Sequence, residues 1–339
     1  MRTMYRLAAG FLLVLVSACS TLPPGERGDL SIEPVRAASI PAIVPRWQPI
    51  SARGEVAVFA GKVEAPRLEF WALKIERDSG MEDRLVGDTD IKTPPALEEK
   101  PVLRILLGPG AGFLRPGYVL STRVSSFVRD NGLLAGINTV PFDPSSRREG
   151  EERRVVGIAV IEGKEISPPA PRYDALLFYQ DGRAAIVNQG ELGAEPSSRD
   201  ILYAVGGFHC LLRDGELTER ALQKAAGPRY ARSAAGLSNG GKTLYLIAIN
   251  GGLPGNRGAT EAETALILKQ LGARDVLNLD GGGSSALALR FPRDTVKILN
   301  TPSHGGFPGQ ERAVALCLGI GFYPAADEEP SSYVNGSQN

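Results

Sequence analysis

The sequence predicts an α+β fold: a mainly antiparallel sheet of many short strands with a few packed helices, in a single domain. Two observations support this class. Short segments rich in β-branched and aromatic residues recur along the chain, separated by glycine and proline turns. Hairpin turns, rather than regular alternation of strand and helix, connect these segments. The 40 glycines and 25 prolines among 339 residues suit such a turn-rich chain.

Strands are expected where a short apolar run lies between turn residues. These runs cover residues 55–62, 68–75, 101–108, 132–138, 155–163, 174–187, 202–216, 243–251, 275–280, 284–290 and 312–322. The dipeptides at 181–182 and 214–215 are both Asp-Gly, which predicts a hairpin turn within two of the runs.

Helices are expected at two places. Residues 121–131 form one candidate. In the other, Thr260 followed by Glu263 predicts a capping box that opens a helix through residues 262–271, and Gly272 predicts its end. Residues 79–100 are polar and interrupted by prolines, which indicates a loop.

The N-terminus has the pattern of a targeting segment. Arg2 and Arg6 precede an apolar stretch at residues 7–16 that is far too short to span a membrane. It ends in VSAC, which resembles a bacterial lipobox whose Cys19 is acylated; ordinary signal-peptidase cleavage is the alternative. Ser20, in place of Asp, indicates an outer-membrane lipoprotein that faces the periplasm.

We therefore expect a lipoprotein signal peptide at residues 1–19, a Pro-rich tether at 20–50, the folded domain at 51–324 and a disordered polar tail at 325–339. The predicted membrane contact is the N-terminal lipid anchor. Lys plus Arg and Asp plus Glu both number 38, so the charge balance does not indicate nucleic acid as a partner.

Cysteine and histidine usage indicates neither a cofactor nor a metal site. Cys210 and Cys317 lie in apolar, strand-like runs, so a disulfide and two buried free thiols are both open. His209 and His304 stand far apart, and neither has a Cys or His at a chelating offset. An oxygen-ligated divalent ion remains open, because such sites lack a reliable spacing signature.

The most informative segment is DVLNLDGGGSSALAL, residues 275–289. An apolar strand delivers Asp280 to three glycines, whose backbone can approach a ligand closely and direct N–H groups at an anion. The structural alternative is a glycine-rich hairpin in which Asp280 caps its own turn.

This segment resembles the signature of the phosphodiester glycosidase family. Three more pieces match in order: AGIN at 135–138, although the following TVPFD departs from the family; residues 231–251, where Ser233 stands in place of the common Thr; and residues 298–319. The resemblance is dense over residues 203–322.

The resemblance implies a hydrolase that cleaves the bond between a sugar and a phosphodiester in a sugar-1-phosphodiester or a cell-envelope phosphoglycan. Asp280 would be the nucleophile or general base, and Arg232 and Arg312 would hold the phosphate. A phosphate with a second pKa of about 6 leaves without strong acid help. Glu311 is the candidate for a second carboxylate, with Asp143 as a rival.

The remaining candidate residues would bind substrate. Asn138 and Asn300 would orient sugar hydroxyls, and His304 would act as acid or substrate contact. The residues that would offer donors to the substrate or position it are Gly281, Gly282, Gly283, Ser284 and Ser285.

Two other functions fit parts of the pattern. A catalytically inactive lipoprotein that binds an envelope phosphoglycan would account for the altered TVPFD segment. A serine hydrolase would use Ser284 with Asp294 and His304, but the motif leads into a strand where a nucleophile elbow leads into a helix. The glycines at 106–113 lack the spacing of a dinucleotide site.

Overall fold

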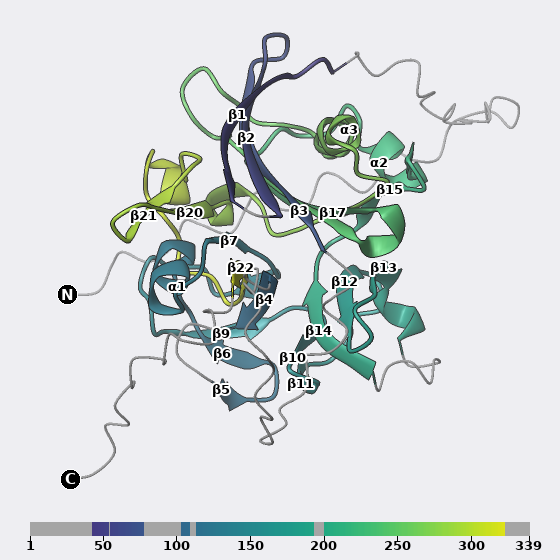
Figure 1. Cartoon of the computed structure of the whole chain (residues 1–339), viewed down its shortest axis with the longest axis vertical. Helices are drawn as coiled ribbons and strands as arrows, with labels where there is room; N and C mark the ends of the chain where they lie inside the picture. The colour runs from purple at the N-terminus through teal and green to yellow at the C-terminus, as the bar shows by residue number, and fades with distance from the viewer. Residues whose placement is uncertain (1–42, 54, 78–102, 109–112, 193–199, 323–339) are drawn as a thin grey trace, which may run out of the picture. The chain divides into compact units, whose positions relative to one another are not determined.

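A computed structural model describes residues 43–53, 55–77, 103–108, 113–192 and 200–322 (Figure 1). The predicted signal peptide with Cys19, most of the tether, the loop at 79–100 and the tail at 325–339 lie outside these residues. Within them, the strands form four sheets, and every ladder between named strands is antiparallel. The predicted fold class is confirmed.

The main sheet has eight strands in the order β1-β2-β3-β18-β17-β19-β15-β16. Their bounds are β1 (Arg46–Arg53), β2 (Val56–Val63), β3 (Leu68–Glu76), β15 (Cys210–Arg213), β16 (Glu216–Leu217), β17 (Arg232–Ser238), β18 (Thr243–Ile249) and β19 (Asp275–Asn278).

Three smaller sheets complete the architecture. The second sheet, in the order β11-β10-β14-β12-β13, contains β10 (Ala159–Ile161), β11 (Lys164–Ser167), β12 (Asp174–Tyr179), β13 (Ala184–Asn188) and β14 (Ile201–Gly206). The third sheet, in the order β21-β20-β7-β22-β4, contains β4 (Leu103–Gly108), β7 (Ala135–Asn138), β20 (Leu287–Phe291), β21 (Thr295–Ile298) and β22 (Cys317–Phe322). The fourth, in the order β5-β6-β9-β8, contains β5 (Phe113–Arg115), β6 (Tyr118–Leu120), β8 (Phe142–Asp143) and β9 (Glu152–Val155).

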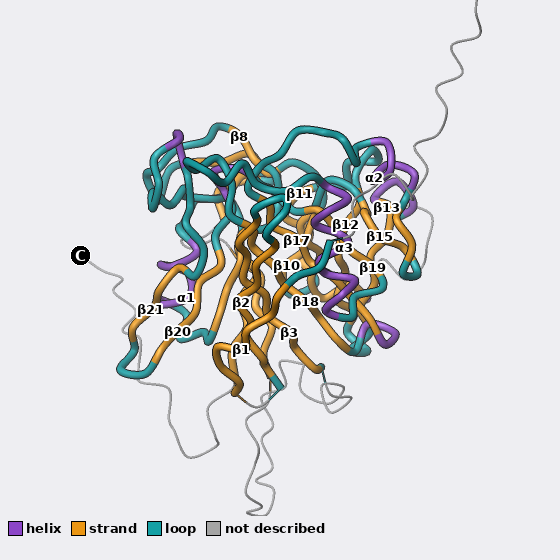
Figure 2. The backbone as a smooth tube through the Cα atoms, turned by 90° about the horizontal axis from the view of Figure 1, so that it is seen from above, coloured by secondary structure: helices purple, strands orange, loops and turns teal. Residues whose placement is uncertain are grey.

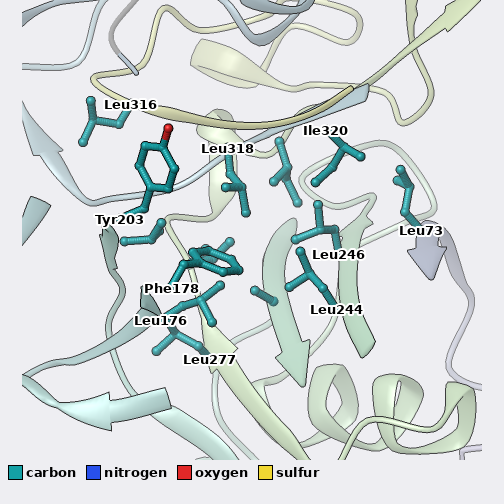
Figure 3. Packing of buried hydrophobic residues seen from close by; sticks show 14 of the residues in the cluster. Leu73, Leu176, Phe178, Tyr203, Leu244, Leu246, Leu277, Leu316, Leu318 and Ile320 are labelled. Atoms are coloured by element: carbon teal, nitrogen blue, oxygen red, sulfur yellow. The ribbon is translucent and has the colours of Figure 1, made fainter. Parts of the chain in front are cut away.

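The main sheet buries both faces, and the alternation of side chains along each strand divides them. In β18, Leu244 and Leu246 join the central core that the main sheet shares with the second and third sheets. Figure 3 shows these side chains near Leu318 and Ile320 of β22. The intervening residues of β18 belong to a second core cluster with residues of α2 (Glu219–Gln223) and α3 (Glu261–Leu271). The two helices lie together near β15 in Figure 1, and Figure 2 also shows β19 beside them.

The predicted helix after Thr260 is confirmed in detail. The Thr260 hydroxyl accepts from the N–H of Glu263, the Glu263 carboxylate accepts from the N–H of Thr260, and α3 ends at Gly272 with a φ of 116°. The other predicted helix is α1 (Val124–Asp130). The sequence did not predict α2, because a helix of five residues is too short to show a period of 3.6.

Glycines let α1 pack directly on the third sheet. A Cβ at Gly136 of β7 would lie 2.7 Å from Val128 Cγ2, and one at Gly319 of β22 would lie 2.9 Å from Phe127 Cε1. Both distances are shorter than a van der Waals contact, so only glycine allows this approach. The packing fixes β7, which carries Asn138 at its end.

The folded chain begins earlier than the sequence suggested. Strand β1 begins within the residues expected to be tether, which were predicted to end at residue 50; it pairs with β2 and places the Trp47 ring 5.0 Å from that of Phe70. Pro49 is tolerated because β1 is an edge strand.

The two Asp-Gly dipeptides lie in the turns of the β12–β13 and β15–β16 hairpins, as predicted. Cys210 and Cys317 are both buried and free, so no disulfide joins them. No helix in the described ranges is long and apolar enough to cross a membrane.

Candidate active site

Asp280 lies where the chain passes from the main sheet to the third sheet. After β19, the N–H of Leu279 donates to Ser233 O of β17 (2.9 Å), and the N–H of Asp280 donates to Thr139 O, just after β7 (2.8 Å). The short 3₁₀ helix η6 (Gly282–Ser284) then leads into β20. The main sheet therefore holds the backbone at Leu279, and the end of β7 in the third sheet holds it at Asp280.

Two hydrogen bonds and the charge of a nearby cation act on the Asp280 carboxyl. Burial raises the pKa of Asp280 to about 6, against the opposing effects of a hydrogen bond from the Ser284 hydroxyl, the positive charge of Arg312 and a hydrogen bond from the N–H of Gly281. The residue keeps partial exposure. A carboxylate with a pKa near 6 is mostly ionised at pH 7 and is still basic enough to take a proton or attack a carbon.

Arg312 connects Asp280 to His304. Its Nη1 donates to Ser284 Oγ at 3.0 Å, and its Nε donates to His304 Nδ1 at 2.9 Å. A Cβ at Gly283 would lie 2.5 Å from Arg312 Nη2, so glycine is required for Arg312 to reach this position. Asp280, Ser284, Arg312 and His304, all predicted from sequence, therefore form one connected group.

The hydrogen bond from Arg312 also defines the state of His304. Because Nδ1 accepts a hydrogen bond, the proton of the neutral ring is on Nε2, which can donate to a ligand. Burial and the charges of Arg312 and Arg147 lower the pKa of His304. The ring is therefore neutral at pH 7, which favours a hydrogen-bond donor over a strong acid.

Sequence reasoning missed Arg147. With the Gln310 amide oriented to satisfy its neighbours, its oxygen accepts from Arg147 Nη1 at 2.6 Å and its nitrogen donates to His304 O at 3.2 Å. Arg147 reaches the site because Ala313 N donates to Ser146 O (3.2 Å). It lies in the run SSRREGEERR, whose mixed charges resemble an exposed loop, so no sequence pattern distinguished it.

Arg232, the second predicted phosphate ligand, is engaged elsewhere. It is buried; its Nε donates to Ala259 O (3.1 Å), its Nη2 donates to Pro228 O (3.2 Å), and its Nη1 lies 3.7 Å from Glu261 Oε1. These contacts tie β17 to the start of α3, so phosphate binding by Arg232 would require them to be exchanged. The geometry favours a structural role.

Asn138 is fully buried, which contradicts direct contact with sugar hydroxyls. Its Oδ1 accepts from Ser233 Oγ (2.7 Å) and from Ala286 N (3.1 Å), and its Nδ2 donates to Asp280 O (2.6 Å). Asn138 therefore positions the backbone of the segment that carries Asp280.

Asn300 has a similar role, and the predicted sugar contact is again contradicted by its burial. Its Oδ1 accepts from Leu287 N and its Nδ2 donates to Ser285 O, both at 2.9 Å. Ser285 itself is fully buried, so its predicted contact with substrate is not possible in this arrangement.

The three glycines contribute less to ligand binding than predicted. The N–H of Gly281 donates to the Asp280 carboxyl, and the N–H of Gly282 donates to Ala231 O at 2.7 Å. These donors shape the turn and hold Asp280. Gly283 provides the space for Arg312 described above.

Glu311, the predicted second carboxylate, lies at the start of α1. It accepts from Ser125 N (3.0 Å) and Ser125 Oγ (2.6 Å), and burial raises its pKa. This geometry is that of a helix cap supplied from another segment. The rival, Asp143, is exposed on β8.

The serine hydrolase hypothesis is wrong for this geometry. The turn at Ser284 leads into strand β20, and Asp294 lies beyond the far end of that strand, where it pairs with Arg290. His304 Nδ1 accepts from Arg312, whereas a catalytic triad needs it to donate to a carboxylate.

Metal ligands do not gather in the part of the chain that the structure describes: no three His, Cys, Asp or Glu side chains there could hold an ion. The Asp280 carboxyl faces an arginine and a serine hydroxyl, which are not metal ligands of choice. The arrangement therefore suits chemistry that relies on a carboxylate and an adjacent cation.

Comparisons with known proteins place these features in context. A family model described as phosphodiester glycosidase matches residues 131–321. No curated protein has a sequence that matches the chain.

Two solved structures share the fold. The catalytic domain of zebrafish N-acetylglucosamine-1-phosphodiester alpha-N-acetylglucosaminidase, auto-inhibited by its pro-peptide, has a TM-score of 0.52 at 17% identity, covering 82% of this chain and 88% of that one. A hypothetical protein from Synechocystis has a TM-score of 0.53 at 14% identity, covering 83% of this chain and 64% of that one. This chain thus spans less than two thirds of the Synechocystis protein. At these identities, the likeness shows the fold alone.

Proposed function

The chain belongs to the phosphodiester glycosidase family, and from that premise we propose that it hydrolyses the bond between a sugar anomeric carbon and a phosphodiester. The substrate would be a sugar-1-phosphodiester or a cell-envelope phosphoglycan. The observation that carries this proposal is the connected group in which Arg312 donates to Ser284 and Ser284 donates to Asp280.

Asp280 supplies the negative charge at the anomeric centre. The hydrogen bond from Ser284 orients the carboxylate, and the charge of Arg312 keeps it ionised despite its burial. Ser284 orients the carboxylate and is itself held by Arg312. This fixes the direction in which the carboxylate can attack a carbon atom.

The phosphate would bind on the side of Arg312 away from Asp280. Arg312 Nη2 lies beside Gly283, His304 presents its Nε2 proton, and Arg147 adds a second guanidinium next to His304. Guanidinium groups match the geometry of phosphate oxygens, and a neutral imidazole adds one donor. This set replaces the second carboxylate of an ordinary glycosidase, because phosphate leaves as an anion.

Two courses of the reaction fit the site. As a nucleophile, Asp280 forms a bond to the anomeric carbon while the bond from that carbon to the phosphate oxygen breaks, and the oxygen keeps the electron pair. Water then releases the sugar from the carboxylate. As a general base, Asp280 accepts the proton of a water molecule that attacks the anomeric carbon directly. Both courses yield free sugar and a phosphomonoester.

The proposed location is the cell envelope, with Cys19 as the acylated residue. The support is the lipobox-like VSAC sequence and the short apolar stretch before it. Labelling of expressed chain with a radioactive fatty acid, lost in Cys19→Ser, would test the anchor.

The activity is tested with the full chain on a panel of sugar-1-phosphodiesters and nitrophenyl glycosides. We expect turnover of phosphodiesters that Asp280→Asn abolishes, while Asp275→Asn, at the start of the strand β19 that leads to Asp280, retains it. Absence of turnover on every substrate, with binding of phosphoglycan unchanged by Asp280→Asn, would instead support a non-catalytic binding lipoprotein.

A further inference from the structure

Two exposed aromatic side chains border the candidate active site. Over the described ranges, the large hydrophobic residues with high exposure are Val44, Ile50, Leu114, Tyr230 and Phe307. The two aromatic members of this set, Tyr230 at 51% and Phe307 at 66% exposure, belong to the segments that carry Arg232 and His304.

Tyr230 is held on one side of the turn formed by Asp280 and the glycines at 281–283, called the Asp280 turn below. Its backbone pairs with Ala259 in both directions (3.2 and 2.9 Å), and the next residue, Ala231, accepts from the N–H of Gly282 at 2.7 Å. The Arg232 guanidinium lies 5.4 Å from the centre of the Tyr230 ring. The ring is therefore supported by a fixed cation and half exposed.

Phe307 is held on the other side of the turn, on a loop closed by hydrogen bonds. The N–H of Gly309 donates to Pro302 O (2.8 Å) and that of His304 to Gln310 O (3.0 Å). Inside the loop, Gly305 has a φ of 65°, a conformation that favours glycine. The loop thus presents Phe307 in a defined position, although exposure of this ring to water is unfavourable.

The two segments are linked through the turn between them. Gly283 packs against His304, where an added Cβ would lie 3.1 Å from His304 Cα, and Ser303 Oγ donates to Gly251 O at 3.0 Å. Gly251 in turn packs against the backbone of Tyr230. Tyr230 and Phe307 therefore stand on two connected segments with the Asp280 turn between them.

We propose that Tyr230 and Phe307 form an aromatic rim that binds saccharide rings of the substrate on either side of the scissile bond. A pyranose ring has an apolar face of C–H groups and a polar edge, so it can cover an aromatic face while its hydroxyls stay in water. This inference rests on the proposed function and narrows it: the substrate is an oligosaccharide or polymeric phosphoglycan, rather than a small sugar phosphate.

Binding is measured separately from turnover, in full-length Asp280→Asn, by saturation-transfer NMR. The ligands are a phosphate-free panel of mono- and trisaccharides of hexoses, N-acetylhexosamines and uronic acids. We expect at least one trisaccharide to bind more tightly than its monosaccharide. Adding Tyr230→Ala and Phe307→Ala should weaken that binding about tenfold or more, because both stacked rings are lost; tenfold corresponds to about 1.4 kcal/mol. Leu114→Ala is the matched control.

The outcomes separate this inference from the proposed function. The aromatic rim is overturned if no saccharide in the panel binds, or if the double variant binds as well as its parent. In that case, turnover that depends on Asp280 would leave the proposed function standing. Conversely, trisaccharide binding that depends on Tyr230 and Phe307, combined with no turnover of any substrate by the parent chain, would support the rim and reject the glycosidase activity.

Discussion

Replacing Asp280 with Asn should stabilise the protein at neutral pH. Burial raises the pKa of Asp280 from an ordinary value of 3.8 to about 6. The folded state therefore binds a proton more tightly than the unfolded state, so its stability falls as pH rises from about 4 through 6. That difference in pKa corresponds to about 3 kcal/mol in full. Because the residue is partly exposed, we expect about 1–3 kcal/mol at pH 7.

The assay is urea unfolding, followed by the fluorescence of Trp47 and Trp71, from pH 3.5 to 8. Asp280→Asn should lose the decrease in stability between pH 4 and 6 and gain a Tm higher by roughly 2–8 °C at pH 7. Asp275→Asn should keep the decrease. The decisive quantity is the slope of the unfolding free energy against pH. The absolute stability is less informative, because the variant also loses the negative charge near Arg312. A variant whose stability still falls with pH as in the parent would refute the assignment of this cost to Asp280.

Four further predictions follow from the same geometry. The pH profile of kcat/KM should rise through about pH 6 as Asp280 ionises; Arg312→Gln should move this limb to higher pH, since loss of the cation raises the pKa of the carboxyl further, and an unmoved limb would contradict the coupling. Arg147→Ala should raise KM for phosphodiesters several-fold, which corresponds to a loss of about 1 kcal/mol of binding free energy, and should leave KM for nitrophenyl glycosides unchanged. An equal rise in KM for both substrates would show that Arg147 does not bind the phosphate. Glu311→Ala should lower the free energy of unfolding by about 0.5–2 kcal/mol through loss of the helix cap while kcat is retained, and an inactive but stable variant would restore Glu311 as a catalytic carboxylate. Gly319→Ala should lower the free energy of unfolding by about 1–3 kcal/mol in urea titrations, because its methyl group would overlap buried side chains; a variant as stable as the parent would show that α1 can move away.

Local patterns were sufficient for much of the fold. The capping box at Thr260 and Glu263 satisfies N–H groups within a single turn, so its sequence signature corresponds directly to a structure. Asp-Gly turns and alternating apolar residues are local in the same way. Strand β1 was missed because an edge strand with two prolines nearby is stabilised by its pairing with β2 rather than by its own composition.

The candidate site was predicted only in part, for a related reason. Asp280, Ser284, Arg312 and His304 were named and do lie together. The same motifs also contained Arg232 and Glu311, and nothing in residue type distinguishes a side chain that faces the substrate from one that holds a helix end. A similar limit applies to Asn138 and Asn300, whose amides serve the backbone of the site.

The sequence by itself determined the class of the fold, the motif around Asp280 and its resemblance to a family, because these depend on the order of residues along short segments. The tertiary structure alone decided which charges meet: it brought Arg147 onto Gln310 beside His304, assigned Glu311 to α1 and raised the pKa of Asp280 by burial. Burial and charge pairing depend on residues distant in sequence, so they arise only when the sheets pack together.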